Sequence, residues 1–81
     1  PRILTGKCLC ETVKFQVEDD FRYSLVCHCS QCRRATGAAN KPFAGIESAK
    51  ISIVDGTNSI LRYGEGENHD VRCGHCGSLL F

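Results

Sequence analysis

Cysteine spacing limits what this chain can become. Seven of its 81 residues are cysteine, in three clusters at residues 8–10, 27–32 and 73–76 that read C-x-C, C-x-C-x-x-C and C-x-x-C. A chain of this size has a thin core and usually needs disulfides or a structural metal to be stable. An odd number of cysteines cannot all pair as disulfides, and thiols this close along the chain suit a metal ion better. Zinc is the usual ion for all-thiolate sites, and iron is the alternative.

The outer two clusters together supply four thiolates, Cys8, Cys10, Cys73 and Cys76. Four thiolates complete a tetrahedral zinc site of the structural type, which would join the two ends of the chain. Residues i and i+2 of a strand point to the same face, so an extended C-x-C could offer both of its thiolates to one ion. The alternative for this set is a pair of disulfides, or free thiols.

The middle cluster supplies three thiolates, Cys27, Cys29 and Cys32. Three protein ligands leave one tetrahedral position open, as catalytic zinc sites do. The alternative is a closed site with one imidazole ligand, which would make both metals structural. The side chains that could supply that ligand are His28, His69 and His75.

Alternation of polar and apolar residues predicts a small, mostly β domain stapled by zinc. Strands are expected over residues 12–18, 21–25, 41–45, 50–54, 59–63 and 78–81, with a turn at 55–58 and a loop at 64–68. A short helix over residues 31–35 is expected after a Ser30 cap, and Gly37 would end it. The side chains assigned to the core are Val13, Phe15, Val17, Ile51 and Ile53.

The formal net charge of +1 argues against a nucleic-acid partner, which would require a basic surface. No segment approaches the roughly 20 apolar residues of a membrane span, and we expect a single cytoplasmic domain over residues 1–81. Arg33 and Arg34 follow the middle cluster and either compensate thiolate charge or bind the carboxylates of an anionic substrate. Lys7 and Arg72 are interpreted as charge compensation.

Three segments resemble the glutathione-dependent formaldehyde-activating enzyme family, which includes the centromere protein V-like proteins. They are G-K-C-L-C at residues 6–10, C-H-C-S-Q-C-R at 27–33 with Gly37, and C-G-H-C-G at 73–77. The resemblance implies a β-tent fold of coiled antiparallel sheets, similar to that of methionine sulfoxide reductase B. It also implies a structural zinc on the outer clusters, a second, labile zinc on the middle cluster, and carbon–sulfur lyase activity on glutathione adducts.

The chain departs from the family pattern in three places. Glu11 stands where the family usually has Gly after the C-x-C, and Arg72 stands where it often has an aromatic residue. Family domains normally run some tens of residues past the last cluster, so we expect either an unusually short protein or a fragment that lacks a C-terminal segment.

These residues are consistent with two functions. The first is a zinc-dependent lyase that acts on adducts of glutathione, or a related thiol, with a small aldehyde. No residue is a clear general base for it, although His28 and His69 are possible. The second is a non-catalytic, zinc-stapled protein-interaction module. Redox chemistry of the methionine sulfoxide reductase kind ranks last, because it needs a metal-free nucleophilic cysteine and every cysteine here lies in a ligand-spaced cluster.

Overall fold

The computed structural model describes residues 2–65 and 68–81, the side chains of residues 65, 68 and 69 excepted. Its strands are β1 (Ile3–Lys7), β2 (Lys14–Glu18), β3 (Tyr23–Cys27), β4 (Lys41–Gly45), β5 (Ile51–Asp55), β6 (Ile60–Glu65) and β7 (Asn68–Cys73). One α-helix, α1 (Ser30–Thr36), and two 3-10 turns, η1 (Ser48–Lys50) and η2 (Thr57–Ser59), complete the described elements. The mostly β prediction is confirmed, and every strand pairing is antiparallel.

The first sheet has the strand order β1-β2-β5 and carries the predicted alternation. Val13, just before β2, and Val17 are buried and Phe15 is half-buried, which confirms the apolar face expected from their spacing. Ile51 and Ile53 on β5 are only half-buried, so they line the margin of the core and not its centre. The strand predicted from residue 12 begins at Lys14, because the chain is still turning after the first cysteine cluster.

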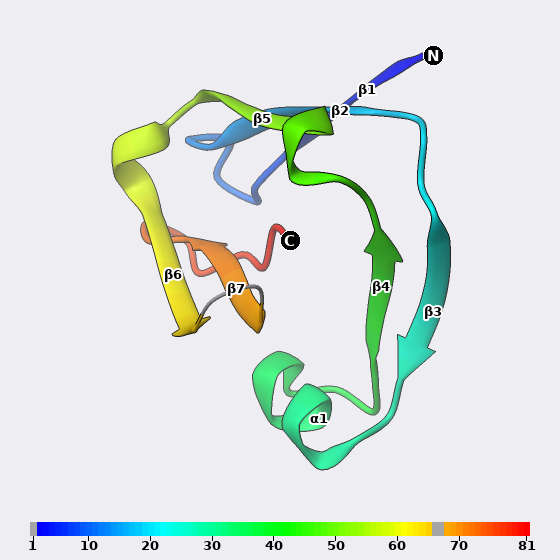
Figure 1. Cartoon of the computed structure of the whole chain (residues 1–81). Helices are drawn as coiled ribbons and strands as arrows, with labels where there is room; N and C mark the ends of the chain where they lie inside the picture. The colour runs from blue at the N-terminus through cyan, green and yellow to red at the C-terminus, as the bar shows by residue number, and fades with distance from the viewer. Residues whose placement is uncertain (1, 66–67) are drawn as a thin grey trace.

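β3 and β4 form a separate hairpin that extends to α1, and together they make an arm away from the first sheet (Figure 1). The N-cap of α1 is Cys29 and not the predicted Ser30, because the Cys29 sulfur accepts a hydrogen bond from the N–H of Cys32. Gly37 ends the helix as predicted, with φ of 69°, a conformation that favours glycine.

The third sheet pairs β6 with β7 and brings the last cysteine cluster to the first. Gly64, Glu65 and Asn68 are strand residues, so the predicted loop at 64–68 is too long; its residues 66 and 67 lie outside the described residues. The strand predicted at residues 78–81 is also wrong, since this segment forms a single isolated bridge, between Leu79 and Arg72. Three backbone hydrogen bonds between Val71 and the last two residues hold it along β7.

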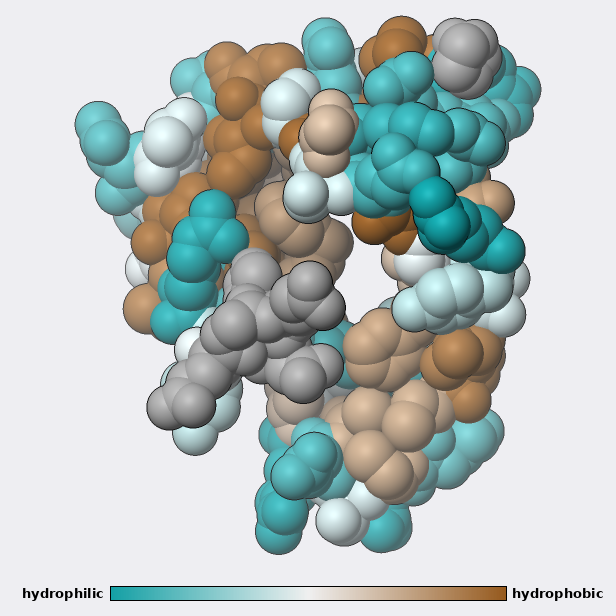
Figure 2. Space-filling model, in the orientation of Figure 1, coloured by the Kyte–Doolittle hydropathy of each residue, from teal (hydrophilic) through white to brown (hydrophobic). Residues whose placement is uncertain are grey.

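The buried core is small and contains sulfur. Cys8, Val13 and Cys73 form its centre, with Ile53, Ile60, Cys76 and Leu80 packed around them. The three sheets and α1 are arranged around the centre of the molecule (Figure 1), and the space-filling view shows a hollow there (Figure 2). Within the described residues, no helix has the length and apolar character needed to cross a membrane.

Candidate metal centres and the cavity beside them

Cys8, Cys10, Cys73 and Cys76 converge, with their sulfur atoms all within 4.8 Å of one another. The Sγ atoms of Cys8 and Cys10 are 3.6 Å apart, and those of Cys10 and Cys73 are 3.8 Å apart. Zn–S bonds of about 2.3 Å in a tetrahedron place sulfurs about 3.8 Å apart. A disulfide needs about 2.05 Å, and all seven cysteines are free. The donor set therefore fits a closed four-thiolate zinc site and not the disulfide alternative.

The backbone around this centre points its N–H groups at the sulfurs. The N–H of Val13 lies 3.3 Å from the Cys8 sulfur, and the N–H groups of His75 and Cys76 lie 3.3 and 3.4 Å from the Cys73 sulfur. Such N–H groups favour the thiolate form, which is the form that binds a metal. The predicted extended geometry of the first C-x-C is wrong, because β1 ends at Lys7 and the cysteines lie in a turn.

The turn after the first C-x-C needs a left-handed residue, and Glu11 supplies it with φ of 65°. A positive φ is a conformation that favours glycine, so a side chain at this position is strained. The N–H of Glu11 donates to the carbonyl of Cys8 at 3.1 Å, and its carboxylate pairs with Lys7 at 3.1 Å. The positive charge of Lys7 is thereby balanced by the carboxylate of Glu11, four residues along the chain.

Hydrogen bonds and burial shift the pKa values of the thiols in this centre in opposite directions. Hydrogen bonds led by the backbone of Cys10 lower the pKa of Cys76 to about 6. Burial alone would raise the pKa of Cys8, but the N–H of Val13 and the neighbouring thiols lower it overall. The N–H of Cys76 acts to lower the pKa of Cys73, yet burial and the adjacent thiols of Cys76 and Cys8 raise it overall. The cluster is thus partly ionised near neutral pH.

Cys27, Cys29 and Cys32 form the second group, and their sulfurs also lie within 4.8 Å of one another. Cys27 ends β3, Cys29 caps α1 and Cys32 lies in its first turn. Among the described side chains, no fourth histidine, cysteine or carboxylate joins them. His28 and His75 are exposed and outside the group, so neither closes it, and the side chain of His69 lies outside the described residues.

In the second group, the pKa values of two thiols are also shifted in opposite directions. The N–H of Cys32 and the thiols of Cys32 and Cys27 donate hydrogen bonds that lower the pKa of Cys29 to about 7. The hydrogen bond with Cys27, with burial, raises the pKa of Cys32 to about 12. A cation at this site would have to displace the protons that the thiols share.

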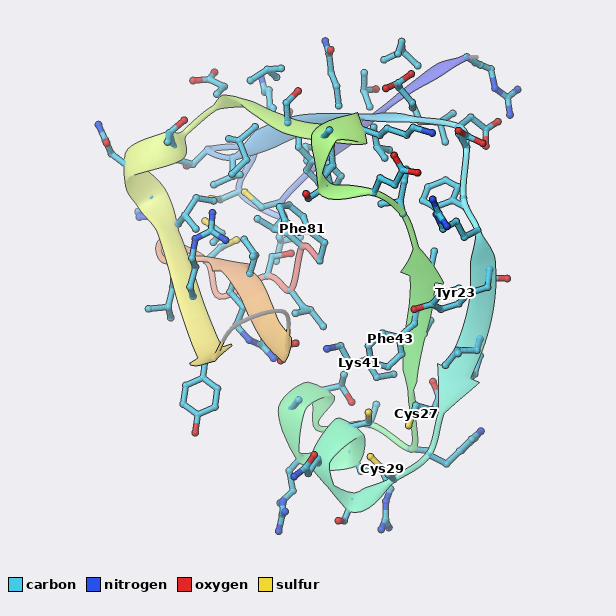
Figure 3. All side chains as sticks on the ribbon, in the orientation of Figure 1. Tyr23, Cys27, Cys29, Lys41, Phe43 and Phe81 are labelled. Carbon is cyan, nitrogen blue, oxygen red and sulfur yellow. The ribbon has the colours of Figure 1, made fainter. Side chains whose placement is uncertain are left out.

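A cavity of about 670 Å³ opens beside the second group, between the arm and the β6–β7 sheet. The residues that line it are Gln31, Cys32, Arg34, Ala35, Lys41, Phe43, Tyr63, Gly64, Asp70 and Arg72. Figure 2 shows it as the hollow at the centre of the face drawn. In Figure 3, Lys41 and Phe43 extend into this space from β4, with Cys27 and Cys29 below them and Phe81 opposite.

Cations predominate among the charged groups of the cavity wall. Lys41 pairs with Asp70 across the space and lies over the Phe43 ring, 4.6 Å from its centroid. The guanidinium of Arg72 donates to two backbone carbonyls, and Arg34 has no ion-pair partner among the described residues. The wall therefore has a surplus of positive charge.

Sequence reasoning placed Arg33 and Arg34 at this site, but only Arg34 lines the cavity; Arg33 is exposed on the same helix. It missed Lys41, Asp70 and the placement of Arg72. For Lys41, the strand register indicates its place beside the middle cysteine cluster. In the observed register it lies directly opposite Cys27 on the neighbouring strand, but that register becomes visible only once β3 and β4 are paired.

The family profile of the glutathione-dependent formaldehyde-activating enzymes matches residues 3–81. The chain belongs to this family. Among solved structures, the crystal structure of a Rhodobacter sphaeroides protein is similar, with a TM-score of 0.72 and 29% identity. That match covers 94% of this chain and 70% of the other. No curated protein matches the chain.

Membership in the glutathione-dependent formaldehyde-activating family confirms the resemblance carried by the three cysteine segments. It also makes a small thiol a plausible partner and associates the chain with enzymes. Two cysteine groups that could hold metal ions are both present, in the division expected from their spacing.

Proposed function

We propose that this chain binds glutathione or a related thiol and makes or breaks the carbon–sulfur bond of its adduct with a small aldehyde. The observation that carries the proposal is the three-cysteine group, of which Cys32 lines a cavity. We assign a structural zinc to Cys8, Cys10, Cys73 and Cys76, and a second, labile zinc to Cys27, Cys29 and Cys32. A closed group with no open face would not support a substrate role.

The chemistry proposed is the reversible addition of a thiol to a carbonyl group. In the breaking direction, the C–S bond of an S-hydroxymethyl adduct cleaves, its hydroxyl proton leaves, and free aldehyde and thiol result. Zinc held by Cys27, Cys29 and Cys32 would keep a substrate thiol ionised at neutral pH. A thiolate is already a strong nucleophile, so the step needs little help from a general base.

Arg34 is the residue proposed to hold a substrate carboxylate. It lines the cavity on the same helix as Cys32 and has no carboxylate partner among the described residues. Guanidinium and carboxylate groups form bidentate pairs, which would orient a thiol-bearing acid toward the cysteines. Arg33 lacks this support, because it does not line the cavity. The volume of about 670 Å³ lies in the range of small-molecule sites.

Proton handling is proposed for the Lys41–Asp70 pair. This pair supplies a donor and an acceptor on the cavity wall, whereas neither His28 nor His75 lines the cavity. The hydroxyl proton of the adduct could pass to Asp70 or to water, and Lys41 would steady the carboxylate. The candidate base His28 has no such placement.

The test is the rate of exchange between free glutathione and its formaldehyde adduct, followed by exchange NMR on the zinc-loaded chain. We expect acceleration by the wild type, loss of acceleration in Cys29→Ser, and weaker glutathione binding in Arg34→Met. Arg33→Met is the matched control, because it removes the same charge from the same helix outside the cavity. Unchanged exchange in Cys29→Ser would refute the catalytic proposal.

A non-catalytic interaction module is the second candidate, and one observation favours it. Three apolar side chains that share one face of the β3–β4 hairpin are unusually exposed: Tyr23 at 57%, Leu25 at 48% and Phe43 at 37%. Contiguous exposed apolar surface is typical of interaction sites. Glutathione binding without accelerated exchange, or two tightly held zinc ions with no thiol bound, would favour this module over the lyase.

A further inference from the structure

We propose that Arg72 couples the two cysteine groups, so that the fold around the first centre sets the metal affinity of the second. Arg72 is a positioning residue in this proposal and binds neither metal nor substrate. The inference rests on the proposed metal occupancy of both groups.

The first link joins Arg72 to the four-cysteine centre. Arg72 precedes Cys73 on β7, and its Nη1 donates to the carbonyl of Gly77 at 3.2 Å. Gly77 directly follows Cys76, and its N–H donates back to the carbonyl of Cys73 at 2.8 Å. The guanidinium therefore braces the turn that carries two of the four sulfurs.

The second link joins the same guanidinium to the helix of the three-cysteine group. The Nη2 of Arg72 donates to the carbonyl of Ala35, in the last turn of α1. The last carbonyls of a helix have no helical N–H partner, and a cation is favourable there. Arg72 therefore supplies a C-terminal cap from another sheet.

α1 has reason to depend on such a cap. It has seven residues, none of them buried, and a helix this short is marginal in water. Its first turn positions Cys29 and Cys32, so loosening the helix would disperse two of the three sulfurs. Groups that hold a metal ligand in place from outside its coordination sphere commonly change metal affinity about 10–100-fold when removed.

The experiment compares the 81-residue wild type with Arg72→Met, Arg72→Lys and Arg34→Met. The first centre is filled with zinc, and Co²⁺ is titrated into the second, followed by its thiolate charge-transfer absorption against a competing chelator. We expect Arg72→Met to weaken the second site about tenfold or more. Arg72→Lys should recover part of the loss, because an ammonium cannot span two carbonyls as a guanidinium does.

Two controls separate coupling from simpler effects. Arg34→Met removes the same charge from the same cavity but has no ion-pair partner to release among the described residues, so it should change second-site affinity less than about threefold. First-site affinity, measured in a Cys29→Ser background, should fall less than second-site affinity on adding Arg72→Met, because the turn that Arg72 braces also keeps the backbone hydrogen bond from Gly77 to Cys73. Equal weakening by Arg72→Met and Arg34→Met, or equal weakening of both sites by Arg72→Met, would overturn the proposal.

Amide hydrogen exchange of α1 provides a readout that does not need the second metal. With only the first centre filled, the N–H of Arg33 and of Gly37, both bonded within the helix, should exchange faster in Arg72→Met than in Arg34→Met. If the wild type binds one metal per chain, the second-site assignment fails while this comparison still decides the role of Arg72. Identical exchange in the two variants would refute it.

Discussion

Replacing Lys41 should destabilise the fold by about 2 kcal/mol, because it would leave Asp70 without its cation in a nearly enclosed position. The two side chains are only 12% and 18% exposed, and they join β4 to β7 across the cavity. Breaking a fully buried pair costs about 3–5 kcal/mol, and the remaining water contact here reduces that figure. Lys41→Met also loses the contact with the Phe43 ring, worth about 0.5–1 kcal/mol, so it should cost more than Asp70→Asn.

A double-mutant cycle isolates the pair. Urea unfolding of wild type, Lys41→Met, Asp70→Asn and the double variant should be measured at one fixed free zinc concentration, because bound metal adds to apparent stability. We expect a coupling energy of about 1 kcal/mol or more, and a shift in urea midpoint of about 1–2 M for Lys41→Met.

The matched control is the exposed Arg2–Asp19 pair. Its Nη2 and Oδ2 atoms are 2.7 Å apart, and its side chains are 75% and 35% exposed. Exposed pairs contribute about 0–1 kcal/mol, so Arg2→Met should cost little. If Lys41→Met were as mild as Arg2→Met, or the coupling energy were near zero, enclosure in the cavity would not govern the strength of this ion pair.

Three further outcomes are expected. Cys76→Ser should unfold the chain, while Cys29→Ser should keep the fold and lose one metal, as circular dichroism and native mass spectrometry would show; a folded Cys76→Ser protein would contradict the structural role. With zinc in the first centre and the second centre empty, alkylation of Cys29 should speed up as pH rises through about 7, since the thiolate forms above its pKa, and a flat profile between about pH 6 and 8 would contradict this. Glu11→Gly should be more stable than Glu11→Ala by about 1 kcal/mol in urea unfolding, because both lose the carboxylate but only Gly relieves the left-handed strain; equal stability would argue against that strain.

Local patterns predicted the elements that depend on near neighbours. The alternation of Val13, Phe15 and Val17 identified the apolar face beside β2, and Gly37 marked the end of α1, because these signals act within a few residues. Two local predictions were wrong. The first C-x-C lies in a turn and not on a strand, and Cys29 replaced Ser30 as the helix cap, since its sulfur was already directed at the N–H of Cys32.

The sequence by itself determined which cysteines could act together, because ligand number and spacing already divide seven thiols into four and three. Only the tertiary structure decided what surrounds them. Lys41 and Asp70 are 29 residues apart, and Arg72 and Ala35 are 37 apart, so no local pattern links them. The physical reason is that strand pairing sets these neighbours. Register places Lys41 opposite Cys27, and the meeting of the arm with β7 creates the cavity and its charge.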